Sequence, residues 1–192
     1  MTKIVRCEWI DRGPLYLDYH DNEWGYPMHD DKDLFRQLCI QGFQAGLSWD
    51  LVLKRKAKLD EAFDNFDPDK IIKYDDKKIA EILQTDGVIK NKLKVNAVVS
   101  NAKAFFKVKE EFGSFDKYVW SFVDYKHIVH DFEKVEDLPA ETEESKKISE
   151  DMKKRGFKFV GSKIIYNFME AMGLVNDHFS YCSFKNGKIK SE

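Results

Sequence analysis

Apolar residues recur along most of this chain with the spacing of an α-helix, and this period constrains the fold more than any other feature. Only four prolines and ten glycines interrupt the 192 residues, so helices of several turns can form between short breaks. Residues 126–139 are expected to be irregular, and little strand is expected anywhere. The expected helices cover residues 31–45, 49–63, 115–123, 142–154 and 162–173. The sequence therefore predicts an all-α fold.

Two further helices are expected on either side of the break TDGVIKN, residues 85–91. Apolar residues within 79–83 fit a short amphipathic helix before the break, and those within 93–106 fit a longer one after it. This helix-hairpin-helix pattern can offer backbone N–H groups and a helix N-terminus to a phosphate without reading base sequence. Gly87 is the only glycine of the break, so the hairpin alone is a weak indicator of DNA binding.

Length and composition favour a globular chain. With 43% hydrophobic residues, the chain can bury a full core as one domain over residues 1–192, or as two small lobes. No run approaches the roughly 20 apolar residues that cross a bilayer, and the first residues lack the apolar core of a signal peptide. Three scattered cysteines suggest no disulfide framework and fit a reducing compartment. We therefore expect a cytoplasmic protein without a membrane partner.

The formal charge of −2 excludes the strong basic excess that marks many nucleic-acid-binding proteins. The basic residues are nevertheless grouped, in KRKAK (54–58), KNKLK (90–94) and KKRGFKF (153–159). A single lysine run most often lies on a solvated helix face. Such groups can also contact phosphates, so local phosphate binding stays open as an alternative.

Two cysteines and two histidines near the chain ends have spacings that suit one metal ion. Twelve residues separate Cys7 from His20, and His178 and Cys182 form an H-x3-C pair. Two thiolates and two imidazoles make a closed tetrahedral zinc set, with no open position for a substrate water. The plainer alternative is two buried thiols and two surface histidines. If the site exists, it ties the two ends of the chain together, which is a structural task.

The stretch CIQGFQAGLSW, residues 39–49, places an amide on the apolar face of an expected helix. Leu34, Leu38 and Gln41 fall on one side of that helix, so Gln41 points where a leucine would be expected. A glutamine near a helix end most often reaches water or a nearby carbonyl. A buried amide instead needs partners for its donors and its acceptor, either in an internal network or in a cavity with a polar ligand.

Several blocks of the sequence occur together in a recognisable order, with nothing large inserted between them. They are YHDNEWGYP (19–27), QAGLSW (44–49), VWSFV (119–123), KKRGFKFVG (153–161) and GLVNDH (173–178). In these blocks the chain resembles the DNA-3-methyladenine glycosylase I family, the bacterial Tag-type enzymes. The resemblance implies a helix-hairpin-helix glycosylase that flips an alkylated adenine out of double-stranded DNA and hydrolyses its N-glycosidic bond in base excision repair. Such an enzyme is monofunctional, and we expect a monomer.

The resemblance also favours the zinc interpretation over the plainer one. Cys7, His20, His178 and Cys182 all fall on the family's ligand positions. The implied Zn²⁺ is structural, and it joins the segments 1–25 and 160–185.

The family's base pocket corresponds here to Tyr16, Tyr19, Trp24 and Trp49. Stacking and cation–π attraction at these rings would favour a cationic base over neutral adenine. Each ring has core packing as its plainer alternative. For the other two tryptophans, at positions 9 and 120, we expect core packing.

The remaining implied roles concern the DNA duplex. Gly46 and Leu47 match the segment that the family inserts at the lesion, where an apolar wedge fills the gap left by a flipped nucleotide. Gly87, Lys90 and Lys158 are candidate contacts to phosphates.

The chain departs from the family at Gln41, because the family has a glutamate at this place in its pocket. An amide keeps one acceptor for the exocyclic amine of the base but loses the negative charge. That loss would cost on the order of 1.5–3 kcal/mol, about ten- to a hundredfold in affinity or rate. Asp21 and Glu23 are alternative sources of charge, but no sequence pattern places them in the pocket.

Different functions remain open at this point. The chain is either a working glycosylase in which Gln41 is the catalytic pocket residue, or a paralogue that binds damaged DNA without cutting the glycosidic bond. A bifunctional nicking glycosylase is disfavoured, because it needs a nucleophilic lysine beside the hairpin and a following aspartate. The stretch LKVNAVVSNAKAF after the hairpin contains no aspartate.

Overall fold

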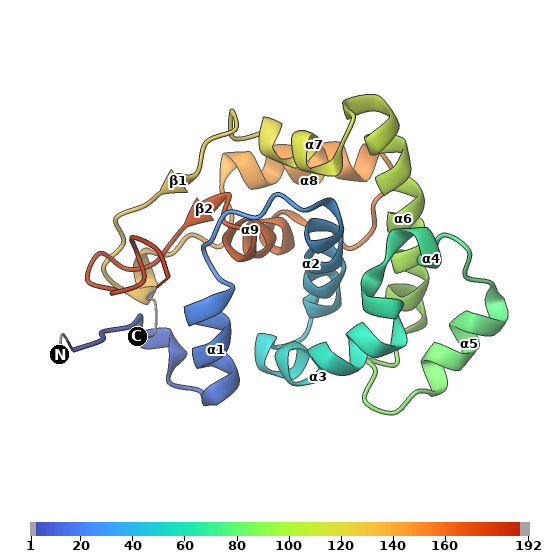
Figure 1. Cartoon of the computed structure of the whole chain (residues 1–192), viewed down its shortest axis with the longest axis horizontal. Coiled ribbons are helices and arrows are strands. Elements are labelled where there is room, and N and C mark those ends of the chain that lie inside the picture. Colours follow the sequence, from blue (N-terminus) through green and yellow to red (C-terminus); the bar gives the residue numbers. More distant parts are fainter. Residues whose placement is uncertain (1–2, 189–192) are drawn as a thin grey trace.

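The computed structural model describes residues 3–188, and helices make up most of this part (Figure 1). Its α-helices are α1 (Pro14–Asn22), α2 (Asp31–Gln44), α3 (Trp49–Ala62), α4 (Pro68–Ile71), α5 (Asp76–Gln84), α6 (Lys92–Phe112), α7 (Phe115–Ser121), α8 (Glu143–Lys154) and α9 (Ser162–Ala171). Short 3-10 turns are η1 (Glu8–Ile10), η2 (Asp64–Phe66) and η3 (Val135–Asp137). β1 (Ile128–Val129) and β2 (Val175–Asn176) form a parallel pair in which Ile128 lies opposite Val175. The prediction of a mostly helical fold is confirmed.

The helices expected over stated ranges are all present, and their ends differ from the expected ones by at most two residues. The apolar period does not predict α1 or the short α4. Both begin with a proline at the first helical position, Pro14 and Pro68, where a missing N–H group costs no hydrogen bond. The β1–β2 pair was also not predicted, because strands of two residues are too short to have a period of their own.

Side-chain caps fix where α2 and α3 begin. Asp30 Oδ1 accepts hydrogen bonds from the backbone N–H groups of Lys32 and Asp33 at 2.8 and 3.0 Å. Ser48 Oγ accepts one from the backbone N–H of Leu51 at 3.3 Å. Each such cap contributes about 1 kcal/mol. The Ser48 cap therefore fixes where the turn between α2 and α3 ends.

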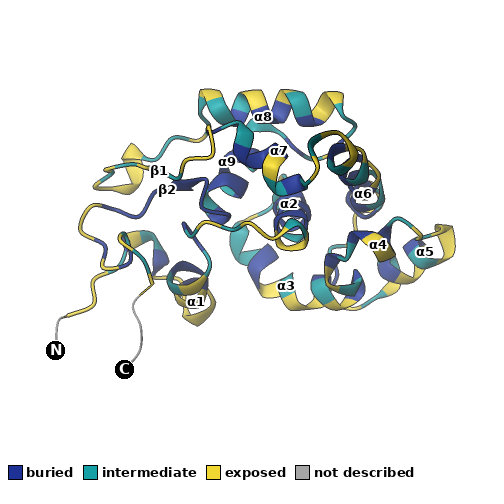
Figure 2. Cartoon of the chain, turned by 45° about the horizontal axis from the view of Figure 1, so that its top comes forward, coloured by how far each residue is buried: buried dark blue, intermediate teal, exposed yellow. Residues whose placement is uncertain are grey.

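α2 is the central helix of the fold, because α3, α6, α7 and α9 all pack against it. Figure 2 shows α2 and α9 as largely buried elements in the middle of the molecule. From Leu34 to Phe43 every residue of α2 is buried except the half-buried Arg36. Burying one leucine- or phenylalanine-sized side chain contributes about 1.5–3 kcal/mol. This packing also carries Gln41 into the interior, where it is 1% exposed.

The N-terminal segment and the C-terminal loop lie together on one side of the molecule, on the left in Figure 1. The backbone N–H of Val5 donates to Ser183 Oγ at 3.0 Å, and the N–H of Ser183 donates to the Val5 carbonyl at 2.8 Å. Residues 24–28 then cross the end of α9, where the N–H of Gly25 donates to the Glu170 carbonyl at 2.8 Å. Both ends of the chain therefore contribute to the same region.

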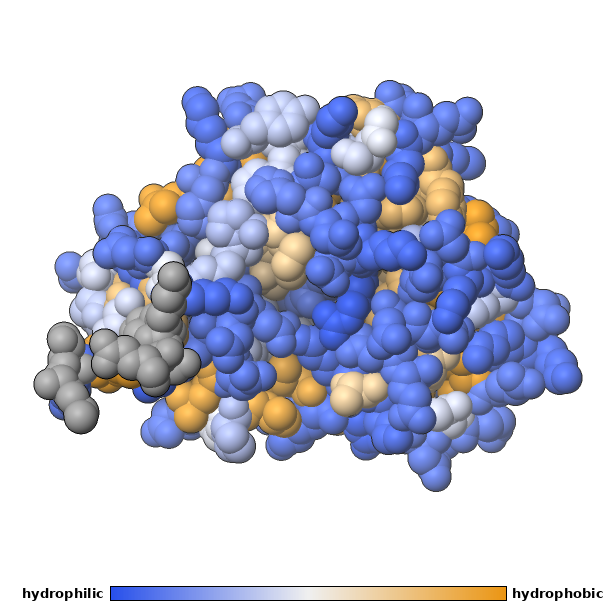
Figure 3. Space-filling model, viewed as in Figure 1, coloured by the Kyte–Doolittle hydropathy of each residue, from blue (hydrophilic) through white to orange (hydrophobic). Residues whose placement is uncertain are grey.

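Polar side chains cover most of the face seen in Figure 3, and apolar residues form only small, separate groups on it. The apolar side chains gather instead in a continuous buried cluster that extends from Cys7 to Phe184. Within residues 3–188, no helix combines the length and the apolar character needed to cross a membrane.

Candidate active site and metal centre

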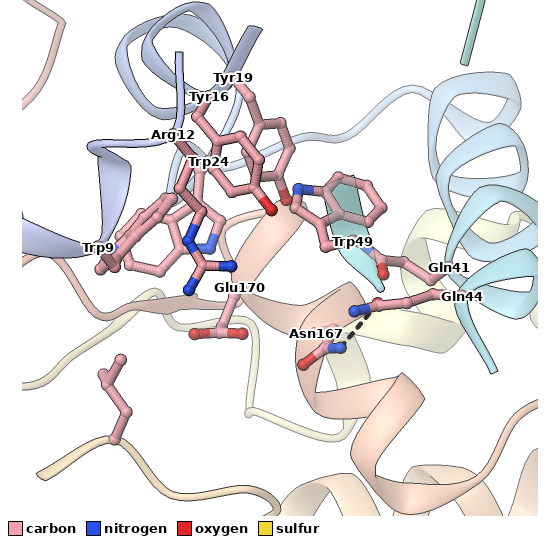
Figure 4. A pocket seen from close by; sticks show the side chains of 11 residues that line it. Trp9, Arg12, Tyr16, Tyr19, Trp24, Gln41, Gln44, Trp49, Asn167 and Glu170 are labelled. Atoms are coloured by element: carbon pink, nitrogen blue, oxygen red, sulfur yellow. Dashed lines mark hydrogen bonds between the residues drawn. The ribbon is translucent and has the colours of Figure 1, made fainter. Parts of the chain in front are cut away.

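A cavity of about 260 Å³ lies where α1, α2, the start of α3 and the end of α9 meet (Figure 4). Ligand pockets typically measure roughly 300–1,000 Å³, so this cavity suits a single small ring compound. The pocket residues expected from the sequence all line it: Tyr16, Tyr19, Trp24, Gln41 and Trp49. The chain thus brings together residues from three helices and the segment after α1.

Aromatic rings surround the cavity from several sides (Figure 4). The rings of Tyr19 and Trp49 lie 5.0 Å apart, centroid to centroid, and are tilted by 53°. The rings of Trp9 and Trp24 lie 4.8 Å apart and meet edge to face. Flat faces of this kind suit stacking on a planar ring, and they attract a ring that carries positive charge.

Several polar atoms in the cavity wall have no hydrogen-bond partner. Gln41 Oε1 and the indole N–H groups of Trp9 and Trp49 are buried and unpaired within residues 3–188. An unpaired buried group costs about 1–3 kcal/mol, so a ligand that pairs with these atoms would recover that cost. The nearby Gln44 is already paired, since Asn167 Nδ2 donates to its Oε1 at 2.8 Å. Three residues that line the cavity therefore each have a polar atom without a partner in the described part of the chain.

Tyr19 keeps its proton in this environment. Burial raises the pKa of the Tyr19 phenol well above its ordinary value, and the negative charge of Glu170 acts in the same direction. A hydrogen bond with Gln41 acts in the opposite direction but does not outweigh them. The hydroxyl of Tyr19 is therefore a neutral group in the wall of the cavity.

Cys7, His20 and Cys182 form a buried group that could hold a metal ion, because their ligand atoms lie within 4.8 Å of one another. Cys182 Sγ lies 3.5 Å from His20 Nε2, and the backbone N–H of Phe179 donates to Cys7 Sγ at 3.4 Å. Hydrogen bonds with Cys7 and His20 lower the pKa of the Cys182 thiol. This shift favours the thiolate, which is the form that binds metals.

A second layer of side chains orients His20. Its Nδ1 lies 2.8 Å from Asp21 Oδ1, which leaves Nε2 for the cysteines. Arg6 holds Asp21 from the other side through Nε at 3.0 Å and Nη2 at 2.8 Å. Burial alone would raise the pKa of Asp21, but the hydrogen bonds from Arg6 and His20 outweigh it and lower the pKa. A carboxylate behind a histidine is the usual support of a metal ligand.

His178 lies beside this group of three but is not part of it. Its ring is fully buried, with its centroid 4.7 Å from that of His20, and its Nδ1 lies 2.8 Å from Asn176 Oδ1. The other ring nitrogen, Nε2, is buried and has no hydrogen-bond partner among the described residues. Burial lowers the pKa of His178 to about 3, so the ring is neutral. A neutral imidazole with one unpaired nitrogen is the form that binds a metal.

Trp24 connects the metal-binding group to the cavity. Its indole stacks on the His20 ring at 6.1 Å and lies 4.7 Å from the His178 ring, and it also lines the cavity. The next residue, Gly25, has no room for a side chain, because a Cβ there would lie 2.8 Å from the His178 ring. Displacing either histidine would therefore move one wall of the cavity.

Gly46 and Leu47 lie in the turn between α2 and α3. Gly46 is exposed with φ of +73°, and no atom lies within 4 Å of the place that a Cβ would take. Lys94, in the first turn of α6, holds this turn, since its Nζ donates to the carbonyls of Phe43 and Ala45 at 2.8 and 2.6 Å. Lys94 is only 5% exposed, and burial lowers its pKa. The turn is thereby tied to the second helix of the hairpin.

Replacing Lys94 with methionine is expected to loosen the turn. Methionine keeps the buried aliphatic chain but donates to neither carbonyl, and an unpaired buried carbonyl costs about 1–3 kcal/mol. We expect a lower midpoint of thermal unfolding and faster amide hydrogen exchange in residues 45–48, measured by mass spectrometry. The control is Lys92→Met, at an exposed position in the same helical turn. Equal exchange in both variants would contradict the proposed role of Lys94.

The candidate phosphate contacts lie against α6 or the loop before it. Gly87 is in the loop between α5 and α6 with φ of +87°, and a Cβ there would lie 2.8 Å from the Lys58 side chain. Lys90 is exposed in the same loop. Lys158 is also exposed, and its backbone N–H donates to Asn101 Oδ1 on α6 at 2.7 Å.

Trp9 packs against the core as expected, but this half-buried side chain also lines the cavity, which the sequence did not predict. Trp120 does pack in the core, and its Nε1 donates to the Met28 carbonyl at 3.0 Å. Asp21 and Glu23 are not among the lining residues, since Asp21 pairs with Arg6 and Glu23 with Lys56.

The sequence analysis assigned no role to the other lining residues. They are Arg12, Gln44, Leu138, Asn167 and Glu170. They come from four separate segments, and each has the residue type of an ordinary surface or loop position. Only the packing of α9 and η3 against the N-terminal half brings them to the cavity.

The chain is similar to known proteins over nearly its whole length. A family model described as methyladenine glycosylase matches residues 9–186. A DNA-3-methyladenine glycosylase of Haemophilus influenzae is 44% identical over 181 residues, which cover 94% of this chain and 98% of that protein. DNA-3-methyladenine glycosylase 1 of Escherichia coli is 42% identical, over 93% of this chain and 96% of that protein.

The fold is also similar to solved structures of glycosylases. One of them, of 3-methyladenine DNA glycosylase I from Staphylococcus aureus, is described as showing the structural basis of 3-methyladenine recognition. It is 33% identical to this chain, covers 97% of this chain and 98% of its own, and superposes with a TM-score of 0.90.

Proposed function

The chain belongs to the methyladenine glycosylase family, and we propose that it acts as a DNA-3-methyladenine glycosylase in base excision repair. In this role it is a monofunctional enzyme that hydrolyses the N-glycosidic bond of 3-methyladenine in alkylated DNA. The observation that carries the proposal is the cavity, in which aromatic rings surround unpaired polar atoms. Its volume of about 260 Å³ suits one flipped base.

The charge of the substrate explains why aromatic rings can provide much of its binding and selection. A base methylated at N3 and still bonded to its sugar carries positive charge, so its glycosidic bond is already weakened. When the bond breaks, its electron pair passes to the base, which leaves uncharged, and a water oxygen bonds to the sugar carbon. Stacking on an aromatic side chain contributes about 1–3 kcal/mol per base. The cation–π attraction selects the charged base over neutral adenine.

We assign Gln41 an orienting role in the cavity. Its buried, unpaired Oε1 can accept a hydrogen bond from the exocyclic amine of the base. The unpaired N–H groups of Trp9 and Trp49 can donate to ring nitrogens. An amide transfers no proton at neutral pH, so Gln41 would act by holding the base in place.

Double-stranded DNA is the partner that fits the surrounding surface. Leu47, beside the unhindered Gly46, offers an apolar side chain that can fill the gap left by a flipped base. The loop with Gly87 and the start of α6 can donate backbone N–H groups to a phosphate, and the exposed Lys90 and Lys158 can add charge. Lys94 ties the wedge turn to α6, so both features would act on one duplex.

We propose that Cys7, His20, Cys182 and His178 hold a structural zinc ion. Two sulfurs and two imidazole nitrogens are a preferred donor set for zinc. The unpaired, buried Nε2 of His178 supports its role as the fourth ligand. Bound zinc would tie the N-terminal segment to the C-terminal loop, and four protein ligands leave no position for a substrate water.

We also propose that residues 1–192 form one domain that acts as a monomer in the cytoplasm. The continuous apolar cluster joins elements from both halves of the described chain, which supports a single domain.

Release of free 3-methyladenine from methylated double-stranded DNA tests the proposed function. The base would be measured by chromatography for the wild-type protein and for Gln41→Glu, beside a protein-free reaction that corrects for spontaneous loss. We expect release by both proteins, because Gln41 still offers an acceptor and the aromatic rings are unchanged. Release only by Gln41→Glu, with DNA binding but no product for the wild type, would make the chain a lesion-binding paralogue and contradict the proposal.

A further inference from the structure

We propose that Glu170 supplies the negative charge that the cavity presents to the cationic base, in place of the carboxylate that Gln41 lacks. The proposal rests on the proposed glycosylase function, and it names the residue that makes this cavity selective for a charged base. Nothing in the linear sequence connects Glu170 to Gln41, because 128 positions separate them on two different helices.

The position of Glu170 carries the first part of the argument. Glu170 lies in the last turn of α9, which packs against α2, and it lines the same cavity as Gln41. Figure 4 shows its carboxylate among the cavity side chains, on the side away from Tyr16 and Tyr19. It is the one acidic residue among the described residues that line the cavity.

Tyr19 provides independent evidence that Glu170 and Gln41 face one space. The charge of Glu170 and a hydrogen bond with Gln41 both act on the pKa of the Tyr19 phenol, in opposite directions. Both side chains therefore act on the same buried phenol, whose ring lies 5.0 Å from that of Trp49, centroid to centroid. A base stacked on these rings would lie between the amide and the carboxylate.

The partner of the Glu170 carboxyl is another acid, Asp177, with which it shares a hydrogen bond. Within residues 3–188, no lysine, arginine or histidine forms an ion pair with it. Arg12 is the basic residue of the cavity wall, and its guanidinium lies over the Tyr16 ring at 5.8 Å. The acidic residues nearby in the N-terminal segment, Asp21 and Glu23, are occupied by cations outside the cavity.

The neighbours of Glu170 disfavour its charged form. Burial raises the pKa of Glu170, and the neighbouring Asp177 raises it further. Asp177 has its own partners, since the Tyr166 hydroxyl donates to it at 2.5 Å and His130 Nδ1 lies 2.7 Å from it. A hydrogen bond with Asp177 also raises the pKa of Glu170, so these neighbours favour its protonated form, and a cationic ring in the cavity is the group that would stabilise the charged form.

The backbone holds Glu170 at this place. Its carbonyl accepts the hydrogen bond from the Gly25 N–H at 2.8 Å, one residue beyond the cavity residue Trp24. The backbone of Glu170 is therefore tied to the segment that carries Trp24. A carboxylate beside a bound base discriminates between a charged and a neutral ring of the same shape.

Binding of two small probes tests the proposal without requiring any cleavage. The charged probe is 3,9-dimethyladeninium, which mimics 3-methyladenine bonded to its sugar, and the neutral probe is 9-methyladenine. Dissociation constants would be measured by NMR titration of the full-length protein. Glu170→Gln is expected to weaken binding of the charged probe about ten- to a hundredfold. Binding of the neutral probe should change less than about twofold, because shape and stacking stay the same.

Two further variants sharpen the test. The control Glu23→Gln removes a carboxylate outside the cavity, and it should leave both dissociation constants unchanged. The double variant Gln41→Glu/Glu170→Gln moves the carboxylate to α2 and should restore most of the affinity for the charged probe. No recovery would overturn the claim that the two positions present the same group to the base.

Other outcomes separate this proposal from the proposed function. Equal loss of affinity for both probes in Glu170→Gln would assign Glu170 a packing role and overturn the proposal, as would no loss at all. Base release from methylated DNA, measured on the same proteins, reports on the glycosylase function alone. A wild-type protein that releases no base but needs Glu170 for the charged probe would contradict the glycosylase function and support the role of Glu170.

Discussion

The variant Cys182→Ser is expected to lose its zinc and to unfold far more easily than the wild-type protein. Cys182 is one of three buried residues whose ligand atoms gather within 4.8 Å, and a serine hydroxyl is a poor zinc ligand at that place. Binding of a structural metal contributes directly to folding, so its loss should cost more than about 4 kcal/mol. For a chain of this size, that corresponds to a fall of roughly 10 °C in the unfolding midpoint.

Metal analysis of the purified proteins and thermal unfolding would measure both effects. The matched control is Cys39→Ala, because Cys39 is equally buried but lies in α2, outside the metal-binding group. It should keep a full equivalent of zinc and lose about 1 kcal/mol. The zinc proposal would be wrong if the wild-type protein contained well under one equivalent and kept its unfolding midpoint after chelation.

The metal should matter for base binding as well as for stability. Trp24 contacts the rings of His20 and His178 and lines the cavity, so losing the metal would release one aromatic wall. The proposed ion would therefore take no part in the reaction and would still be required for base binding.

Gly173→Ala is expected to lower the free energy of unfolding by about 3 kcal/mol or more, the sum of overpacking and backbone strain. A Cβ at Gly173 would lie 2.1 Å from the carbonyl carbon of Tyr26 and 2.3 Å from the nitrogen of Pro27. These are backbone atoms, so they cannot turn aside as a flexible side chain would. The φ of +65° at Gly173 adds strain for any residue with a side chain. Residues 24–28 would have to move away from α9.

Chemical denaturation of Gly173→Ala and Gly156→Ala separates the two contributions. Gly156 also has positive φ, at +97°, but no atom lies within 4 Å of the place of its Cβ. Its alanine variant should therefore show the cost of backbone strain alone, about 1–2 kcal/mol. If both variants lost the same stability, the close approach of residues 26 and 27 to α9 would not be what requires a glycine at position 173.

The sequence predicted those helices in which the spacing of apolar residues repeats over several turns. The apolar residues of α2 and α6 recur over three or more turns, and both helices are where the period places them. α1 was missed because its buried face contains Tyr16, Tyr19 and His20, which do not register as an apolar stripe. The β1–β2 pair depends on contacts between distant segments, which no local pattern reveals.

The sequence predicted those residues of the candidate site that break a local pattern. Gln41 was identified because it breaks an apolar face, and the burial of its side chain agrees with that interpretation. No sequence pattern identified Glu170, since glutamates are mostly exposed and one near a helix end is expected to face water. Only the packing of α9 against α2 turns it toward the cavity. The helical period also could not show that Trp9 lines the cavity.

The central claim is that the cavity between α1, α2 and α9 holds the alkylated base. A crystal structure of the protein with bound 3-methyladenine tests it most directly. The predicted result is one base in the cavity, stacked among the rings of Tyr16, Tyr19 and Trp49, with its exocyclic amine at Gln41 Oε1 and Glu170 facing the ring. A base bound elsewhere, or a cavity that stays without density at saturating concentration, would contradict the claim.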